Sequence, residues 1–296
     1  MKKIPVVIRL NGGLGNQMFQ YAFGRAIAEI RKAPLILNCY GFKCKISGVT
    51  QRTYALDSFT LADSVMVSYE PYYFNLNRFA RFVPFMDRML SVCFEKNISY
   101  DLKAYNDIHS SAFVGYWQSY RYFESISEII LKDFNFRGKF CSSFINYKKD
   151  INLNQSVMLH VRRGDYVSLA SASSYHGVLN IDYYKLAASE VLSREPKACF
   201  FVFSNDIDWC RQALKFLPEN TRYIEPDPCR CDVQELILMS LCKYQIIANS
   251  SFSWWSAWLS NSNQNKSQTM IIAPNSWFVN QKIENYNRFP SHWIVL

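Results

Sequence analysis

The chain has 296 residues, of which 49% are hydrophobic and 16% aromatic, and this composition excludes a disordered or low-complexity protein. The length leaves room for two domains of ordinary size. Its 33 lysine and arginine residues outnumber the 24 acidic ones and give a net charge of +9. That charge favours an anionic partner: a nucleotide, a nucleic acid or an acidic membrane surface.

The chain begins with a pattern that predicts a strand, a turn and a helix. Residues 6–10 are apolar, residues 11–17 are rich in glycine, and residues 18–30 have helical spacing. We expect Gly13 and Gly15 in a loop whose backbone N–H groups face an anion at the helix start. The spacing fits neither a dinucleotide fingerprint nor a P-loop, and a simple tight turn is the alternative.

Targeting and metal signals are weak in this sequence. The first ten residues are too short and too charged for a signal peptide, and no apolar run reaches membrane-spanning length. Nine cysteines and four histidines show no metal-ligand spacing. We therefore expect a cytoplasmic protein with reduced thiols, no metal site and no cofactor.

The middle of the first half is the least regular part. Aromatic and basic residues alternate over 69–94, which predicts a helix that lies either on a membrane surface or in the core. The aromatic residues of 115–118 suit either stacking on a sugar or a buried cluster. The polar stretch 139–155 indicates a connection between domains, and we place the two domains at 1–150 and 151–296.

The second half alternates strands with helices. This alternation predicts a parallel sheet with helical crossovers, as in a Rossmann-like nucleotide domain. The predicted strands are 157–161, 199–203, 222–224, 244–248 and 270–273, and the predicted helices are 182–192, 207–216, 233–241 and 252–259.

The first of these strands ends in two arginines. Arg162 and Arg163 offer planar, permanently charged groups that suit a phosphate or diphosphate at the end of a parallel strand. Gly164 allows a close approach of the backbone, and Asp165 is placed to orient an arginine or to take a proton. An ordinary surface Arg–Asp pair and an Arg-Gly-Asp adhesion signal are the alternatives.

Two further strand ends carry polar groups. Asp206 and Asp208 have the spacing of a metal–diphosphate site, but helix capping is an alternative, which we favour for Asp208. Asp206 suits the two N–H donors of a guanine edge. The hydroxyls of 250–253 stand at a predicted helix start, where they suit either a second phosphate cradle or capping alone.

Four stretches, taken together, resemble the α-1,2-fucosyltransferases of glycosyltransferase family 11. They occur in the order of the family and span nearly the whole chain: residues 12–21, 160–166, 204–206 and 250–255. The resemblance implies an α/β fold of the GT-B type, with two Rossmann-like domains facing across a cleft. The N-terminal domain would lie on the acceptor side, and the C-terminal domain would bind GDP-fucose.

The resemblance also implies a reaction. A galactoside 2-α-L-fucosyltransferase transfers L-fucose from GDP-β-L-fucose to the 2-hydroxyl of a terminal galactose, with inversion and without a metal. The expected partners are GDP-fucose and a β-galactoside-terminated oligosaccharide or lipid-linked glycan. The animal relatives carry an N-terminal anchor and this sequence shows none, so it resembles a bacterial, cytoplasmic member, with peripheral contact at the inner membrane face left open.

The family pattern suggests roles for the motif residues. Arg162 and Arg163 would stabilise the leaving diphosphate. In wider fucosyltransferase families one such arginine contacts the diphosphate and the other is more structural, and Arg162 is the first choice for the contact here. His160 would lie near the nucleotide, with a satisfied core histidine as the alternative. Asp206 would bind guanine, and Asn16 would reach donor or acceptor. The residues expected to line the diphosphate are Ser251, Phe252 and Ser253.

The identity of a general base stays open. Asp165 is the acid closest to the arginines, but an ion pair with one of them would lower its basicity. Related α-1,6-enzymes carry a glutamate a few residues past this motif, and residues 167–175 contain no acid here. A largely dissociative reaction without a dedicated base is therefore the alternative.

Three rival functions remain at this stage. The first is a GDP-sugar transferase that uses another sugar or another acceptor hydroxyl. The second is a non-enzymatic nucleic-acid-binding protein, suggested by the charge and by the mixture of aromatic and basic residues. The third is a peripheral membrane scaffold that uses residues 69–94. Four ordered motifs favour the enzyme over the two non-enzymatic alternatives, and we expect no nucleic-acid partner.

Overall fold

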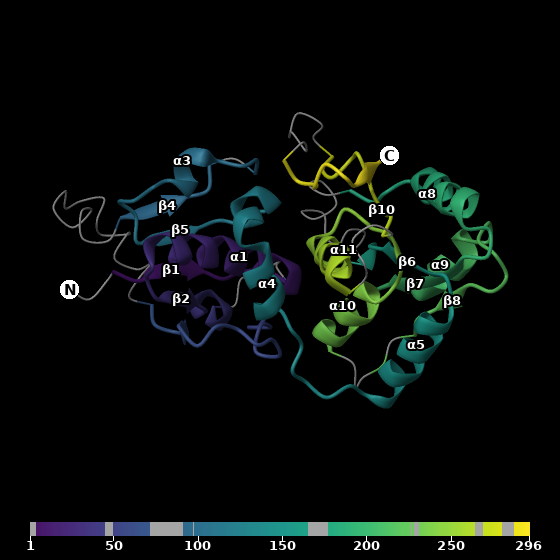
Figure 1. The fold of residues 1–296 in the computed structure, drawn as a ribbon, viewed down its shortest axis with the longest axis horizontal. Helices are drawn as coiled ribbons and strands as arrows, with labels where there is room; N and C mark the ends of the chain where they lie inside the picture. The colour runs from purple at the N-terminus through teal and green to yellow at the C-terminus, as the bar shows by residue number, and fades with distance from the viewer. Residues whose placement is uncertain are drawn as a thin grey trace. The chain divides into compact units, whose positions relative to one another are not determined.

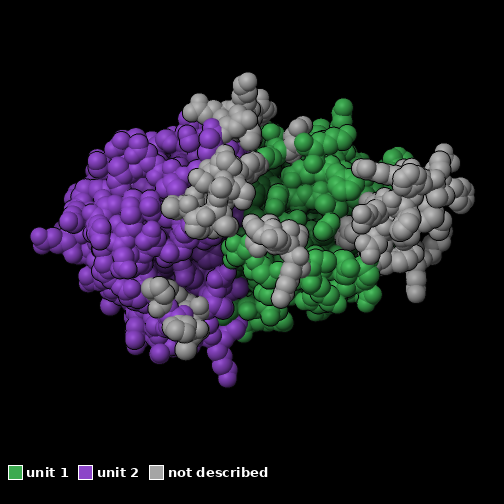
Figure 2. Space-filling view, turned by 180° about the vertical axis from the view of Figure 1, so that it is seen from behind, with its two compact units in different colours: residues 1–137, 286–288 green, residues 138–285, 289–296 purple. Residues whose placement is uncertain are grey.

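A computed structural model of the chain divides into two compact units, which are coloured separately in Figure 2. Unit 1 comprises residues 1–137 and 286–288, and unit 2 comprises residues 138–285 and 289–296. The structure describes residues 4–44, 50–71, 91–96, 98–164, 177–225, 227, 231–263, 269–279 and 287–296.

Unit 1 contains a five-stranded sheet whose paired strands are all parallel (Figure 1). The spatial order β3-β2-β1-β5-β4 reverses direction between β1 and β5. The carboxyl ends on either side of such a reversal form the crevice where open α/β sheets bind ligands. The strands are β1 (Val6–Arg9), β2 (Leu35–Asn38), β3 (Val65–Ser68), β4 (Val92–Phe94) and β5 (Ala112–Val114).

Helix α1 (Leu14–Arg31) packs against this sheet and starts directly after β1. Gly24 permits this contact, because a Cβ there would lie 2.3 Å from Cγ1 of Ile8. Asp133 accepts hydrogen bonds from Oη of Tyr21 (2.7 Å) and Nε of Arg25 (3.0 Å), which ties α1 to α4. The other helical segments of unit 1 are η1 (Tyr40–Lys43), α3 (Leu102–Tyr105), η3 (Tyr120–Tyr122), η4 (Glu124–Ile126) and α4 (Ser127–Asp133).

Unit 2 contains a six-stranded sheet, also parallel in every pair. Numbered from β6, its order reads 3-2-1-4-5-6, the order of dinucleotide-binding Rossmann domains, with the reversal between β6 and β9. The strands are β6 (Ser156–Val161), β7 (Cys199–Ser204), β8 (Arg222–Tyr223), β9 (Tyr244–Ile246), β10 (Ile271–Ala273) and β11 (Ile294–Val295).

Helices cover this second sheet (Figure 1). Apolar residues of α8 and α9 form one core with alternate residues of β6 and β7, such as Leu159 and Val202. Helices α10 and α11 pack on each other, and α10 also contacts α5. The helices are α5 (Ser142–Leu153), α8 (Ile181–Arg194), α9 (Ile207–Ala213), α10 (Asp232–Ser240) and α11 (Ser251–Asn263).

The strand and helix predictions for the second half are confirmed, with boundary shifts of a few residues. The prediction of a connection over 139–155 is wrong, because α5 occupies most of it and buries Phe144 and Ile151. The two compact units meet in sequence between residues 137 and 138, and the expected domain boundary after residue 150 falls inside α5.

The aromatic and basic segment 69–94 lies largely outside the described residues, which resume at 91. Its last three residues form strand β4 rather than the end of a helix. None of the helices within the described ranges is both long enough and apolar enough to cross a bilayer.

Candidate functional site

The carboxyl end of β6 brings a buried histidine next to an arginine. His160 is 3% exposed, and within the described ranges its Nδ1 has no hydrogen-bond partner. Its ring centroid lies 6.0 Å from that of Phe252 on α11. Burial, followed by the charge of Arg162, lowers the pKa of His160 to about 3. The imidazole is therefore neutral at physiological pH.

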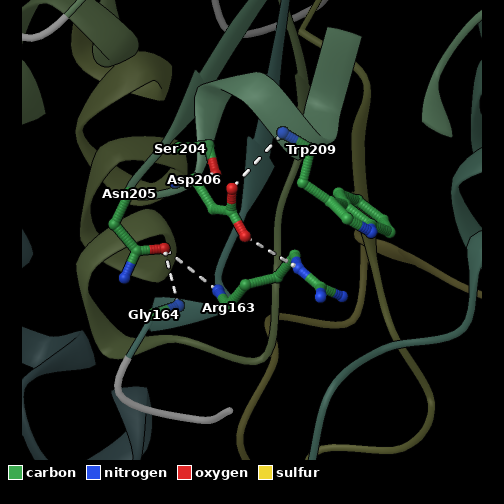
Figure 3. A network of polar contacts seen from close by, with 6 residues as sticks. All are labelled: Arg163, Gly164, Ser204, Asn205, Asp206 and Trp209. Atoms are coloured by element: carbon green, nitrogen blue, oxygen red, sulfur yellow. Dashed lines mark hydrogen bonds and ion pairs between the residues drawn. The ribbon is translucent and has the colours of Figure 1, made fainter. Parts of the chain in front are cut away.

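Asn205, which follows β7, holds the turn after β6 (Figure 3). Its Oδ1 accepts hydrogen bonds from the backbone N–H of Arg163 (3.0 Å) and of Gly164 (3.2 Å). A Cβ at position 164 would lie 2.2 Å from Nδ2 of Asn205. The expected close approach at Gly164 is therefore made to this amide, and any other residue there would displace it.

The side chain of Arg163 lies between an acid and an aromatic ring. Its Nε is 3.2 Å from Oδ2 of Asp206, and its guanidinium carbon lies 4.0 Å from the ring centroid of Trp209 (Figure 3). Side chains of this ion pair are 20% and 37% exposed, so solvent screens it only in part. These contacts orient Arg163 within the protein.

Asp206 also caps α9. Its Oδ1 accepts the backbone N–H of Trp209 at 3.3 Å, while Asp208 lies in the first turn of the helix. The capping role that we favoured for Asp208 therefore belongs to Asp206. Both oxygens of Asp206 already accept a hydrogen bond, although a carboxylate has about four lone-pair sites.

The turn between β9 and α11 carries serine hydroxyls. Strand β9 is the neighbour of β6 at the point where the strand order reverses. Ser250 Oγ accepts the backbone N–H of Phe252 at 3.3 Å, so this serine, rather than Ser251, lies in the capping position. Ser253 is fully buried, and its hydroxyl contacts the carbonyls of Ala248 (3.4 Å) and Ser250 (3.3 Å). Ser251 is half-buried and begins the helix.

Unit 2 therefore places cationic and hydroxyl groups at one sheet reversal. Arg162 and Arg163 follow β6, the start of α11 follows β9, and these two strands are neighbours. A 13-residue helix directs its N-terminal end, and with it the positive end of its dipole, toward this edge. Such an arrangement is chemically suited to an anion, and its two arginines match a diphosphate in charge.

The glycine turn of unit 1 is built around Asn16. Gly12 has φ 76°, and a Cβ there would lie 2.5 Å from Nδ2 of Asn16. Gly13 caps α1, and its carbonyl accepts the backbone N–H of Asn16 at 3.0 Å. Gly15 is buried within the first turn of the helix, not in the loop where we expected it. Within this turn, Gly12 is the residue whose backbone requires glycine.

Two glutamines of the same motif have internal roles that the sequence did not reveal. Gln17 donates to the carbonyls of Gly12 (3.0 Å) and Thr53 (2.8 Å), and it accepts the N–H of Ala55. Gln20 accepts the N–H of Asn11 and donates to the carbonyl of Gly115. Both glutamines are fully buried, so they fix the loops around the end of β1.

The predicted site residues thus fall in both units. His160, Arg162, Arg163, Asp206, Ser251, Phe252 and Ser253 belong to unit 2, and Gly13, Gly15 and Asn16 belong to unit 1. Asp165 lies outside the described residues. Among those that are described, no three His, Cys, Asp or Glu residues cluster as a metal site. Sequence reasoning gave no role to Asn205 or Trp209, since only the fold brings them to Arg163.

Comparisons with known proteins agree on one family. A family model described as glycosyl transferase family 11 matches residues 85–296. An alpha-1,2-colitosyltransferase of Escherichia coli is 34% identical, with 98% of each chain covered. The O-antigen biosynthesis glycosyltransferase WbnK of Escherichia coli is 30% identical over 91% of this chain and 93% of the relative. The galactoside 2-alpha-L-fucosyltransferase Sec1 of Mus musculus is 24% identical over 51% of this chain and 42% of the relative.

Two solved structures share the fold. The fucosyltransferase NodZ from Bradyrhizobium superposes with a TM-score of 0.54 at 14% identity, over 86% of this chain and 93% of NodZ. The structure of POFUT1 in complex with GDP gives a TM-score of 0.52 at 14% identity, over 92% of this chain and 98% of POFUT1. At this identity the likeness concerns the α/β fold with its parallel sheets, and the function must be argued from the site.

Proposed function

The chain belongs to glycosyltransferase family 11, and from this premise we propose that it transfers L-fucose from GDP-β-L-fucose to the 2-hydroxyl of a terminal galactose. The β-linked donor would give an α-1,2-linked product with inversion at the anomeric carbon. The proposed acceptor is a β-galactoside-terminated oligosaccharide or lipid-linked glycan.

One observation carries this proposal. In the 3-2-1-4-5-6 sheet of unit 2, two adjacent arginines follow β6 and the start of α11 follows β9, and these are the two strands between which the strand order reverses. When the bond between sugar and GDP breaks, negative charge develops on the β-phosphate and the anomeric carbon becomes cationic. Fixed positive groups at that phosphate lower the barrier, because they interact more strongly with the transition state than with the substrate.

The contacts within unit 2 suggest distinct roles for the two arginines. Arg163 is held by Asp206 and Trp209, so we assign it to the framework of the site and to the rim of the diphosphate. Arg162 is our choice for the β-phosphate. The positive charge of Arg162, together with burial, keeps His160 neutral. The positive charge at the carboxyl end of β6 therefore comes from the two guanidinium groups.

The remaining donor contacts are proposed on the same basis. Asp206 retains lone pairs for the guanine N–H donors beyond those that accept from Arg163 and Trp209. Ser251 and Phe252 stand at the start of α11 and would line the diphosphate. The buried Ser253 would contribute by holding the turn from β9, since its hydroxyl already contacts two carbonyls. Asn16 of unit 1 would contact the donor or the acceptor.

The finer architecture and the base are also proposals. We expect a GT-B arrangement, with unit 1 as the acceptor-side Rossmann-like domain and unit 2 as the GDP-fucose domain. Asp165 stays the candidate base, beside a dissociative reaction that needs none. We expect activity without a divalent metal, and a cytoplasmic location remains a prediction.

A second candidate donor is GDP-linked colitose, favoured by the full-length similarity to an alpha-1,2-colitosyltransferase. Colitose is fucose without its 3-hydroxyl. A site that hydrogen-bonds this hydroxyl would reject colitose by about 10⁴-fold, whereas an apolar site would distinguish the two sugars by only about 10- to 100-fold.

The test is release of GDP from each donor, with and without lactose, in EDTA. We expect acceptor-dependent turnover of GDP-fucose that EDTA does not abolish. If the protein turns over only GDP-colitose, the proposed donor sugar is wrong, but the assignment to glycosyltransferase family 11 is unaffected. Release that strictly requires Mn²⁺ would contradict metal independence, and GDP binding without turnover of either donor would point to a different sugar.

A further inference from the structure

The side chains of Arg288, Gln118 and Asn16 are linked by hydrogen bonds at the point where the strand order of the unit 1 sheet reverses. Nη1 of Arg288 donates to Oε1 of Gln118 at 2.9 Å. Nε2 of Gln118 then donates to Oδ1 of Asn16 at 2.8 Å. We call these residues the Asn16 network. Gln118 follows β5 and Asn16 follows β1, so the network spans the two strands that flank the reversal.

The network has a fixed direction. A guanidinium only donates hydrogen bonds, so Gln118 must turn its oxygen toward Arg288 and its NH₂ group toward Asn16. Asn16 must then turn its oxygen toward Gln118. The orientations of both amides follow from the arginine at one end, which removes the ambiguity that usually attends an amide side chain.

Rigid surroundings hold Gln118. The carboxylate of Glu95, which follows β4, accepts the backbone N–H groups of Tyr116 (2.7 Å) and Trp117 (2.9 Å). Trp117 has φ 55° and stacks on Phe23, with ring centroids 4.1 Å apart and planes 4° from parallel. Residues 115–118 are thus a supporting loop with Trp117 in the core, and only Tyr116 is largely exposed there.

Arg288 is held with comparable precision, although it comes from the far end of the chain. It is 3% exposed. The preceding residue, Asn287, accepts hydrogen bonds from Oγ of Ser119 at its carbonyl (2.6 Å) and from Nη1 of Arg121 at its side chain (3.0 Å). Burial raises the pKa of Glu95, and the charge of Arg288 offsets part of this rise.

The far side of Asn16 lies against the glycine turn. Nδ2 of Asn16 would be 2.5 Å from a Cβ at Gly12, which has φ 76°. The amide nitrogen is therefore at the end of β1, at the edge of the parallel sheet where ligands bind. With Oδ1 turned to Gln118, the side of the amide nearer the glycine turn carries the NH₂ group, which is a hydrogen-bond donor.

We propose that Gln118 and Arg288 are positioning residues that orient the Asn16 carboxamide so that its NH₂ group donates to a substrate oxygen during sugar transfer. This role rests on the proposed function. The oxygen belongs either to the acceptor sugar or to the GDP-sugar, and the two Michaelis constants distinguish these sources.

The decisive variant is Gln118→Glu. A carboxylate pairs with Arg288 at least as well as the amide does, so the melting temperature is expected to stay unchanged or to rise. The carboxylate introduced at position 118 cannot donate a hydrogen bond to Asn16. The Asn16 amide must therefore flip, so that its NH₂ group faces this carboxylate and its oxygen faces the substrate. We expect kcat/KM to fall by about 10²-fold. Wild-type kcat/KM in this variant would overturn the proposal.

Two further variants separate positioning from stability. Ser110→Ala removes a hydrogen bond to Asp107 ahead of β5 and touches no residue of the Asn16 network or its supports, so it should lower the melting temperature and keep kcat/KM within about threefold of wild type. Arg288→Lys retains a donor and should keep more activity than Arg288→Met. Equal losses in these two arginine variants would contradict a directional network.

A measurement that needs no turnover tests the network itself. In a double-mutant cycle of Asn16→Ala and Gln118→Ala, urea unfolding should show that the two changes are not additive. Additive effects would overturn the network. An inactive wild-type protein with intact coupling would instead overturn the proposed function, and with it the substrate role of Asn16.

Discussion

Both sheets of this protein reverse their strand order after their first strand, but the side chains at the carboxyl ends of the two neighbouring strands differ between the sheets. In unit 2, Arg162 and Arg163 follow β6 and the start of α11 follows β9. In unit 1, Asn16 follows β1 and Gln118 follows β5. The unit 2 edge has two consecutive arginines after one strand. The unit 1 edge has amides whose direction is fixed by hydrogen bonds, and its nearby arginines include Arg288, bonded to Gln118, and Arg52, beside Gly13.

This difference matches two chemical tasks. A leaving diphosphate accumulates negative charge, which fixed cations stabilise over several ångströms. A sugar hydroxyl is neutral, so it is recognised by the direction of a hydrogen bond rather than by charge. Arg288 fits this division, because it donates to Gln118, and Gln118 in turn donates to Asn16.

The largest expected effect is loss of the cation at the unit 2 edge. Arg162→Ala should lower kcat by about 10³-fold, because the developing charge on the β-phosphate loses its counter-charge. Arg162→Lys should recover part of the activity. Arg194→Ala, which removes an exposed arginine of α8 in the same unit, is the matched control. Normal turnover by Arg162→Ala would refute the assignment of this edge to the diphosphate.

At the unit 1 edge, adjacent glycines provide a matched pair. Gly12→Ala should lower kcat/KM by about 10²-fold and destabilise the fold by about 1–2 kcal/mol, because its φ is 76° and the new Cβ would displace Asn16. Gly13→Ala should be tolerated, since its φ is −78° and the nearest atoms, in Arg52, lie 4.0 Å away. Steady-state kinetics and urea unfolding measure both, and equal behaviour of the two variants would contradict the geometry of the turn.

A smaller effect is expected for Asp206→Asn. Asparagine still caps α9 but loses the ion pair with Arg163, whose partly exposed geometry suggests a cost of about 0.5–1 kcal/mol. If Asp206 also binds guanine, KM for the GDP-sugar should rise by about 10-fold. An unchanged donor KM, measured at saturating lactose, would restrict Asp206 to holding Arg163 and the helix.

The last prediction concerns the pH dependence of stability and involves no change in activity. His160 has a pKa of about 3 in the folded protein, below its usual value in the unfolded chain, so the unfolded state binds more protons between these values. Its contribution is fully present above about pH 6.5 and declines by about 1.4 kcal/mol per pH unit as the pH falls toward 3. In urea unfolding at pH 7, 6 and 5, His160→Phe should lose less stability on acidification than wild type. Parallel curves would show that His160 is accessible to protons in the fold.

The sequence predicted unit 2 well because its signal is local. Apolar runs such as 157–161 and 199–203 are continuous, as strands buried on both faces require, and the residues that end them are strongly polar. The two arginines could be recognised for the same reason. The family resemblance was confirmed, and with it the α/β fold.

The start of unit 1 was also predicted, since β1 and α1 occupy the strand and the helix expected over 6–10 and 18–30. The rest of unit 1 resisted prediction because its strands are short and its contacts are distant. β4 and β5 have three residues each, too few for a periodic pattern. In unit 2 one prediction also failed: the polar stretch 139–155 suggested a linker, yet the two buried residues of α5 suffice to dock this helix. The bond from Arg288 to Gln118 joins residues 170 positions apart, and no local pattern announces such a pair.

The most direct test of the account is the linkage of the product. The protein would be incubated with GDP-fucose and lactose in EDTA, and the product would be assigned by NMR. The account predicts an α-fucosyl residue on O2 of galactose. An α-fucosyl residue on any other hydroxyl, or no fucosylated product from a protein that binds GDP, would contradict it.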